Sequence, residues 1–139
     1  MNNILIAVSK HGASKNATEW VSDFLSEHEF DGTVHIVYCD SEKKNVNGAV
    51  IDTQIPSLEQ DSHCLQTAEE ILDSKKIPFQ THIIDGVTPV EGIIDFINDN
   101  NIDLAITGHQ SKKNSYDYVQ SFAQTLIRNS PVPVTVVSS

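Results

Sequence analysis

Apolar residues occur along the chain in two patterns, as short unbroken runs and as longer stretches in which they are spaced three or four positions apart. The short runs are rich in branched side chains, which is typical of strands that are covered on both faces. We therefore expect five strands, at Asn3–Val8, Thr33–Cys39, Phe79–Ile84, Ile102–Thr107 and Pro133–Val137, of which the first and the fourth are expected to be buried.

The stretches between these runs have helical spacing, which predicts four helices with one buried face each. Ser14 is expected to cap the first helix, and Ser57, which has a glutamine three residues later, to cap the second. The fourth helix has apolar residues on one face from Val119 to Ile127. It ends after Arg128, because Pro131 cannot continue a helix.

The third helix has the clearest start signals. Thr88 occupies the N-cap position, Pro89 the first helical position, and Glu91 completes a capping box. The asparagine-rich tract 98–101 ends this helix, since asparagine tolerates a left-handed cap. Residues 40–56, in contrast, carry no apolar pattern, and we expect a long loop there.

The order of elements is strand then helix, repeated four times, followed by a last strand. This alternation predicts an α/β fold, in which a parallel sheet has helices on both faces. Ligands of such sheets bind outside the carboxyl ends of the strands, where the winding direction reverses. Gly108 directly follows the fourth strand and opens a polar loop before a helix. Main-chain N–H groups in such a loop can hold a phosphate.

Composition excludes several classes of partner. The formal net charge of −10 argues against nucleic acid, which requires a basic face, and against anionic lipid. The chain lacks an apolar run of membrane-spanning length, and its N-terminus lacks the features of a signal peptide. Cys39 and Cys64 lie in different elements, which favours two reduced thiols. We therefore expect a cytoplasmic protein with no nucleic-acid or membrane partner.

The chain shows no pattern typical of a metal or catalytic centre. Its six histidines have neither an i, i+4 pair nor a spacing with cysteine that would suggest zinc, so we expect no metal site. No serine, cysteine or histidine stands in a motif such as G-x-S-x-G. We accordingly assign no catalytic residue.

Four segments together resemble the universal stress protein A superfamily: ILIAVS at 4–9, GVTP at 86–89, DLAITG at 103–108 and SFAQTLIRNSPVPVTVV at 121–137. The resemblance covers essentially the whole chain and implies a single domain over residues 1–139. It implies a Rossmann-like fold of the adenine nucleotide alpha hydrolase type, with five parallel strands in the order 3-2-1-4-5. It also implies a homodimer formed by the C-terminal strands. A valine-rich edge strand supports this, since an unpaired apolar edge favours pairing with another chain.

Superfamily members that bind ATP carry G-x2-G-x9-G-(S/T) after the fourth strand, and usually an aspartate at the end of the first. This chain keeps Gly108 and, in Ser121, the hydroxyl of the last pair. Ser111 and Gln120 stand where two glycines belong, the stretch between them is one residue shorter, and Ser9 replaces the aspartate. Glycine allows the backbone to approach phosphate closely. We therefore expect weak or lost binding of ATP, with no other cofactor.

Three further residues complete the set of candidate binding residues. The resemblance places Tyr38 where members contact adenine through the backbone. Its ring could stack on the base or fill the adenine pocket, and we favour the second. His109 could stack on a ligand, hydrogen-bond to it, or be an ordinary loop histidine. Phe122 follows Ser121 of the motif.

The resemblance implies a role in the stress response. We favour a non-enzymatic regulatory homodimer that acts through protein partners and has weak or lost ATP binding. One alternative is an ATP-binding switch or slow ATPase that uses a remodelled phosphate loop. Another is a protein that binds a different adenine-containing or small anionic ligand.

Overall fold

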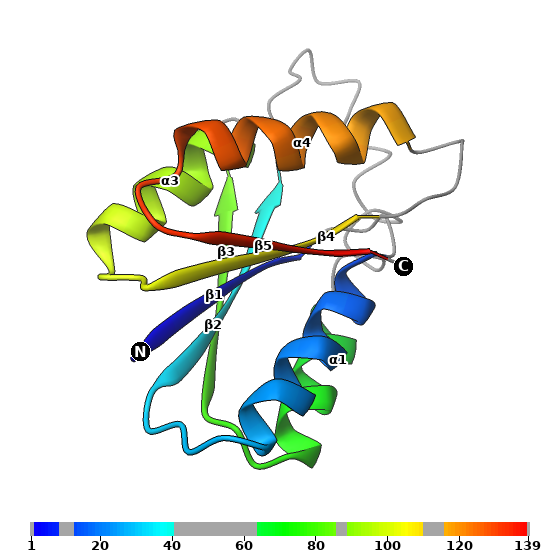
Figure 1. The fold of residues 1–139 in the computed structure, drawn as a ribbon, viewed down its shortest axis with the longest axis vertical. Helices are drawn as coiled ribbons and strands as arrows, with labels where there is room; N and C mark the ends of the chain where they lie inside the picture. Colours follow the sequence, from blue (N-terminus) through cyan, green and yellow to red (C-terminus); the bar gives the residue numbers. More distant parts are fainter. Residues whose placement is uncertain (1, 9–12, 41–63, 86–88, 110–115, 139) are drawn as a thin grey trace.

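The computed structural model describes residues 2–8, 13–40, 64–85, 89–109 and 116–138. They form a five-stranded sheet in the order β3-β2-β1-β4-β5, in which all neighbouring strands are parallel (Figure 1). The strands are β1 (Asn3–Val8), β2 (Thr33–Asp40), β3 (Phe79–Asp85), β4 (Leu104–His109) and β5 (Val134–Ser138). The predicted fold class and the strand order implied by the resemblance are confirmed.

Helices cover both faces of this sheet (Figure 1). On one face lie α1 (Ala13–Ser26) and a helix over residues 64–74, and on the other lie α3 (Pro89–Asp99) and α4 (Tyr116–Asn129). The chain passes from β1 outward to β2 and β3, and then returns to β4 on the other side of β1. The winding direction therefore reverses between β1 and β4, and a ligand crevice is expected outside their carboxyl ends.

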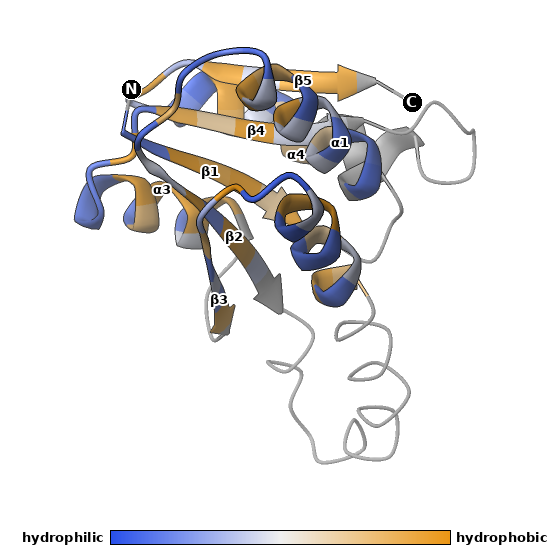
Figure 2. Ribbon diagram, turned by 90° about the horizontal axis from the view of Figure 1, so that it is seen from below, coloured by the Kyte–Doolittle hydropathy of each residue, from blue (hydrophilic) through white to orange (hydrophobic). Residues whose placement is uncertain are grey.

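Each face of the sheet has its own hydrophobic core, because successive residues of a strand point to opposite faces. The core under α1 and the 64–74 helix includes the strand residues Ile4, Ile6, Val8, Val34, Ile36, Tyr38 and Ile106. The core under α3 and α4 includes Leu5, Ala7, Val37 and Ala105. Figure 2 shows the consequence: the central strands are mostly hydrophobic, whereas the helices have one hydrophobic and one hydrophilic side.

Local signals at the ends of α3 and α4 are confirmed. Pro89 begins α3, and α3 ends at Asp99 within the predicted tract. Asn101 has a φ of 54°, the left-handed conformation that asparagine tolerates after a helix. Arg128 lies in the last turn of α4. These signals act over a few residues, which is why the sequence alone is sufficient to place them.

The N-cap predicted for the first helix is wrong. α1 begins at Ala13, so Ser14 lies inside its first turn. The caps predicted at Ser57 and Thr88 lie outside the described residues, as does the predicted 40–56 loop apart from Asp40, which ends β2.

The predicted bounds of the fourth strand are also wrong, by two residues. β4 begins at Leu104, which pairs with Ile4 of β1, whereas the N–H of Ile102 still donates to the carbonyl of Ile97 in α3 (3.3 Å). Just before the strand, the Asp103 carboxylate Oδ2 accepts the N–H groups of Asn2 (2.7 Å) and Asn3 (3.0 Å). At the other end, Gly108 and His109 are part of the strand, since they pair with residues of β5. Smaller shifts occur in β2 and β3, which each run one residue further, and in β5, which both starts and ends one residue later than predicted.

Candidate functional site

The carboxyl edge of the sheet is crossed by one row of residues. Val8 pairs with Tyr38, and Tyr38 pairs with Ile83 on the far edge strand. Ala7 pairs with Thr107, which places Val8 level with Gly108, and Gly108 pairs with Val137 of β5. This row, which we call the carboxyl row, borders the point where the winding reverses. It therefore forms the part of the candidate site that lies within the described residues.

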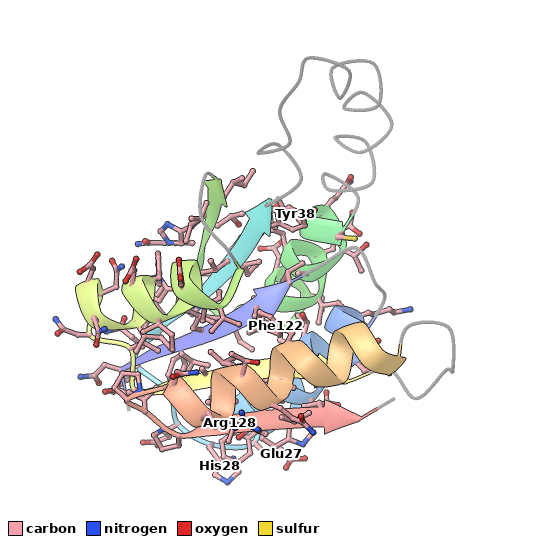
Figure 3. All side chains as sticks on the ribbon, turned by 90° about the horizontal axis from the view of Figure 1, so that it is seen from above. Glu27, His28, Tyr38, Phe122 and Arg128 are labelled. Carbon is pink, nitrogen blue, oxygen red and sulfur yellow. The ribbon has the colours of Figure 1, made fainter. Side chains whose placement is uncertain are left out.

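Tyr38 is a core residue at this edge. Its side chain is only 4% exposed and belongs to the hydrophobic core under α1 and the 64–74 helix, together with Val8 and Leu65. Figure 3 shows Tyr38 at the end of β2. The ring therefore packs between the sheet and its helices on this face.

Gly108 and His109 differ from their predicted setting. Both were expected in a loop, but both are the last residues of β4, paired with Val137 and Ser138 of β5. Pairing with β5 extends β4 past its apolar run, and this long-range contact leaves no mark in the local pattern. Gly108 is buried, and strand alternation puts it on the same face as Ile106 and Tyr38.

The other candidate residues lie in different places. Ser9 and Ser111 are outside the described residues. Gln120 and Ser121 lie on α4. Phe122, also on α4, is partly buried and packs against the core of the opposite face, as its position in Figure 3 indicates. The structure thus places Tyr38 and Phe122 on opposite faces of the sheet.

The described part of the site offers few side chains for chemistry. Apart from the Tyr38 hydroxyl, the carboxyl row contributes only hydrocarbon side chains and main-chain groups. Within the described ranges, no three histidine, cysteine or carboxylate side chains are grouped so that they could hold a metal ion. Among the helices that the structure describes, none is both long and apolar enough to cross a bilayer.

Comparison with known proteins places the chain in a family. A sequence model of the Universal stress protein family matches residues 1–138. No protein with a curated description matches the chain.

Solved structures share the fold at low sequence identity. Universal stress protein UspA from Lactobacillus plantarum is 18% identical, with a TM-score of 0.75 over 98% of this chain and 97% of that one. A universal stress protein from Archaeoglobus fulgidus in complex with dAMP is 16% identical, with a TM-score of 0.69 over 99% and 98%. A protein of the family from Arabidopsis thaliana with AMP bound is 13% identical, with a TM-score of 0.70 over 99% and 92%. With the family model matching nearly every residue and the strand order in agreement, this chain belongs to the universal stress protein family.

Proposed function

We propose that this chain is a non-enzymatic regulatory member of the universal stress protein family, which acts through protein partners and binds ATP weakly or not at all. The observation that carries the proposal is the presence of Ser111 and Gln120 where ATP-binding members have glycine. A Cβ at either position occupies space that the backbone needs in order to approach a phosphate, and it disfavours positive φ. A cytoplasmic location, expected from the composition, remains part of this proposal.

The environment of Tyr38 supports the same proposal. For its ring to stack on an adenine base, the ring would have to leave a core in which it is 4% exposed. Burying a large side chain stabilises the fold by about 1.5–3 kcal/mol. Binding of a stacking ligand would have to offset the loss of this stabilisation. A ring that fills the base pocket fits this burial better than a stacking platform does.

Restoring the two glycines is expected to restore binding. We expect the double variant S111G/Q120G to bind ATP at least about tenfold more tightly than the natural sequence, because roughly 1.4 kcal/mol of steric conflict is removed. Isothermal titration calorimetry measures the difference.

The matched control for this variant is Q124G. Gln124 is exposed on the same helix, so Q124G carries the cost of a glycine in a helix without altering the motif. If S111G/Q120G and Q124G bind ATP equally, the two side chains are not what weakens binding.

A second candidate function is binding of an adenine nucleotide with fewer phosphates. It is favoured by two relatives of the same fold, which were solved with dAMP and with AMP. Such a ligand depends less on the glycines of the phosphate loop. Mass spectrometry of the denatured protein tests it, because a co-purified nucleoside monophosphate supports this candidate and a co-purified triphosphate supports the ATP-binding switch or slow ATPase.

We further propose that the chain forms a homodimer through β5. This strand is at the end of the sheet, and among the described residues its outer edge has no neighbouring strand. The N–H of Ala105 donates to the carbonyl of Pro133 (3.0 Å), so residue 133 faces β4. In a parallel ladder alternate residues face the same neighbour, which directs the main-chain groups of Val134 and Val136 to the free edge. An antiparallel partner strand would pair with these groups.

Proline at position 136 is expected to dissociate the dimer without unfolding the chain. Val136→Pro removes an N–H that faces the free edge and leaves the ladder with β4 intact, as proline does in natural edge strands. Size-exclusion chromatography with light scattering should give a monomer for this variant and a dimer for Val136→Thr, which retains the N–H. An unchanged dimer of Val136→Pro would contradict pairing through β5.

A further inference from the structure

Two histidines form a polar cluster inside the α3 face of the sheet. His35 of β2 and His82 of β3 are hydrogen-bonded, with His35 Nδ1 and His82 Nε2 3.2 Å apart. The second nitrogen of His35, Nε2, lies 3.1 Å from Oδ1 of Asn3 on β1. Phe96 of α3 covers both rings, with its centroid 5.6 Å from that of His35 and 4.6 Å from that of His82. The cluster thus connects three strands and a helix, and its His82 directly precedes Ile83 of the carboxyl row.

The partners of Asn3 fix the direction of these hydrogen bonds. Asn3 Nδ2 donates to the carbonyl of Asn101 (3.4 Å), so its Oδ1 faces His35 as an acceptor. His35 must then donate from Nε2, and its Nδ1 is an acceptor in the neutral ring. His82 therefore donates from Nε2 to His35. When both rings are neutral, each of these hydrogen bonds therefore joins one donor to one acceptor.

In the described part of the chain, the hydrogen-bond partners of the two rings are each other and Asn3, and none of these carries a negative charge. Burial lowers the pKa of His35 and that of His82, and the neighbouring His82 ring lowers the pKa of His35 further. The carboxylates of α3, at Glu91, Asp95 and Asp99, are exposed to solvent. Beyond Asn3, the Asp103 carboxylate is bound to the main chain of Asn2 and Asn3.

We propose that His35 and His82 form a proton-binding latch, which holds α3 against β2 and β3 while at least one ring is neutral and releases it when both are protonated. The first proton is accommodated at Nδ1 of His82, since His82 then still donates from Nε2 to His35. A second proton must enter at Nδ1 of His35, where it meets the N–H of His82. Two donors and two positive charges then face each other 3.2 Å apart beneath Phe96.

The sign of the pH dependence follows from the lowered pKa values. Both groups have a folded-state pKa below the ordinary value of 6.5, so the stability they contribute is fully present above that pH. It is lost as the pH falls below 6.5, because the unfolded or opened chain then binds more protons than the closed one. For each extra proton that the unfolded or opened chain binds, the equilibrium constant for folding or closing falls by about tenfold per pH unit.

The test compares His82→Gln with the natural sequence. Glutamine retains an N–H donor for His35 Nδ1 but does not titrate. Between about pH 7 and pH 5.5, where histidine titrates and most carboxylates do not, we expect the folding equilibrium constant of the natural chain to fall more steeply, by up to about tenfold per pH unit, than that of H82Q. The matched control is His28→Gln. His28 is exposed and lies just past the end of α1, where its Nδ1 is hydrogen-bonded to the carbonyl of Phe24 (2.7 Å). H28Q leaves the hydrogen bond between His35 and His82 intact and should retain the slope of the natural chain.

Two measurements on the natural protein distinguish a latch from general acid unfolding. NMR titration should show His82 taking up the first proton and His35 the second. Hydrogen exchange, corrected for its intrinsic pH dependence, should then show loss of protection in β3 and α3 before β4 and β5. Equal slopes for the natural chain and H82Q, or simultaneous loss of protection in all strands, would overturn the proposal.

Discussion

Replacing Ile36 with alanine is expected to destabilise the protein by about 2–5 kcal/mol, the range for removing a large aliphatic side chain from a packed core. Ile36 lies on β2 between β1 and β3 and is 0% exposed. Its neighbours on the α1 face, such as Ile6 and Leu72, come from a central strand and an overlying helix. Because the strand and the helix that pack against Ile36 are also held by other core residues, they cannot move in to fill the cavity that alanine would leave.

The control for this variant is the same substitution on the surface. Ile127 of α4 is 53% exposed, so Ile127→Ala should change the stability by less than about 1 kcal/mol. Urea unfolding followed by circular dichroism measures both, at one fixed protein concentration because a dimer couples stability to concentration. If the two isoleucines have equal effects, Ile36 is not at the centre of the core.

The second large effect is expected at Gly32, before β2. A Cβ at this position would lie 1.8 Å from the carbonyl oxygen of Asn2. That same oxygen accepts the N–H of Thr33 at 2.8 Å, the contact that begins the pairing of β1 with β2. Gly32→Ala must therefore move main chain against main chain. We expect a loss of about 3 kcal/mol, at the upper end of the range for overpacking.

The comparison for Gly32→Ala is Asp31→Ala. Asp31 is the preceding residue and is exposed, so its truncation should leave the urea midpoint almost unchanged. A Gly32→Ala protein as stable as Asp31→Ala would show that β1 and β2 do not approach each other as closely as described.

Much of the fold could be predicted because its signals are local. The apolar run of β1, the proline that begins α3 and the asparagine that ends it each act within a few residues. The limits of β4 could not be predicted from its apolar run. The start depends on pairing with β1, since Leu104 pairs with Ile4 about a hundred residues away, and the end depends on pairing with β5.

The site could be predicted only in part. Its position at the carboxyl ends of β1 and β4 follows from the strand order, and that order came from the resemblance to a family. The burial of Tyr38 depends on two helices that meet over β2, which a strand pattern does not encode. The pair of His35 and His82 was missed because the residues are 47 positions apart in sequence. One signal was available in the sequence. Both histidines lie within predicted strands, at positions whose side chains point to the same face of the sheet as neighbouring apolar residues.

We propose that Ser111 and Gln120, which replace glycines of the ATP-binding motif, and the buried ring of Tyr38 together prevent tight binding of ATP. Isothermal titration of the natural protein with ATP and magnesium tests it most directly. We expect no saturable binding below about millimolar concentration, which corresponds to roughly −4 kcal/mol. A dissociation constant in the micromolar range or tighter, about −8 kcal/mol or more, would contradict it.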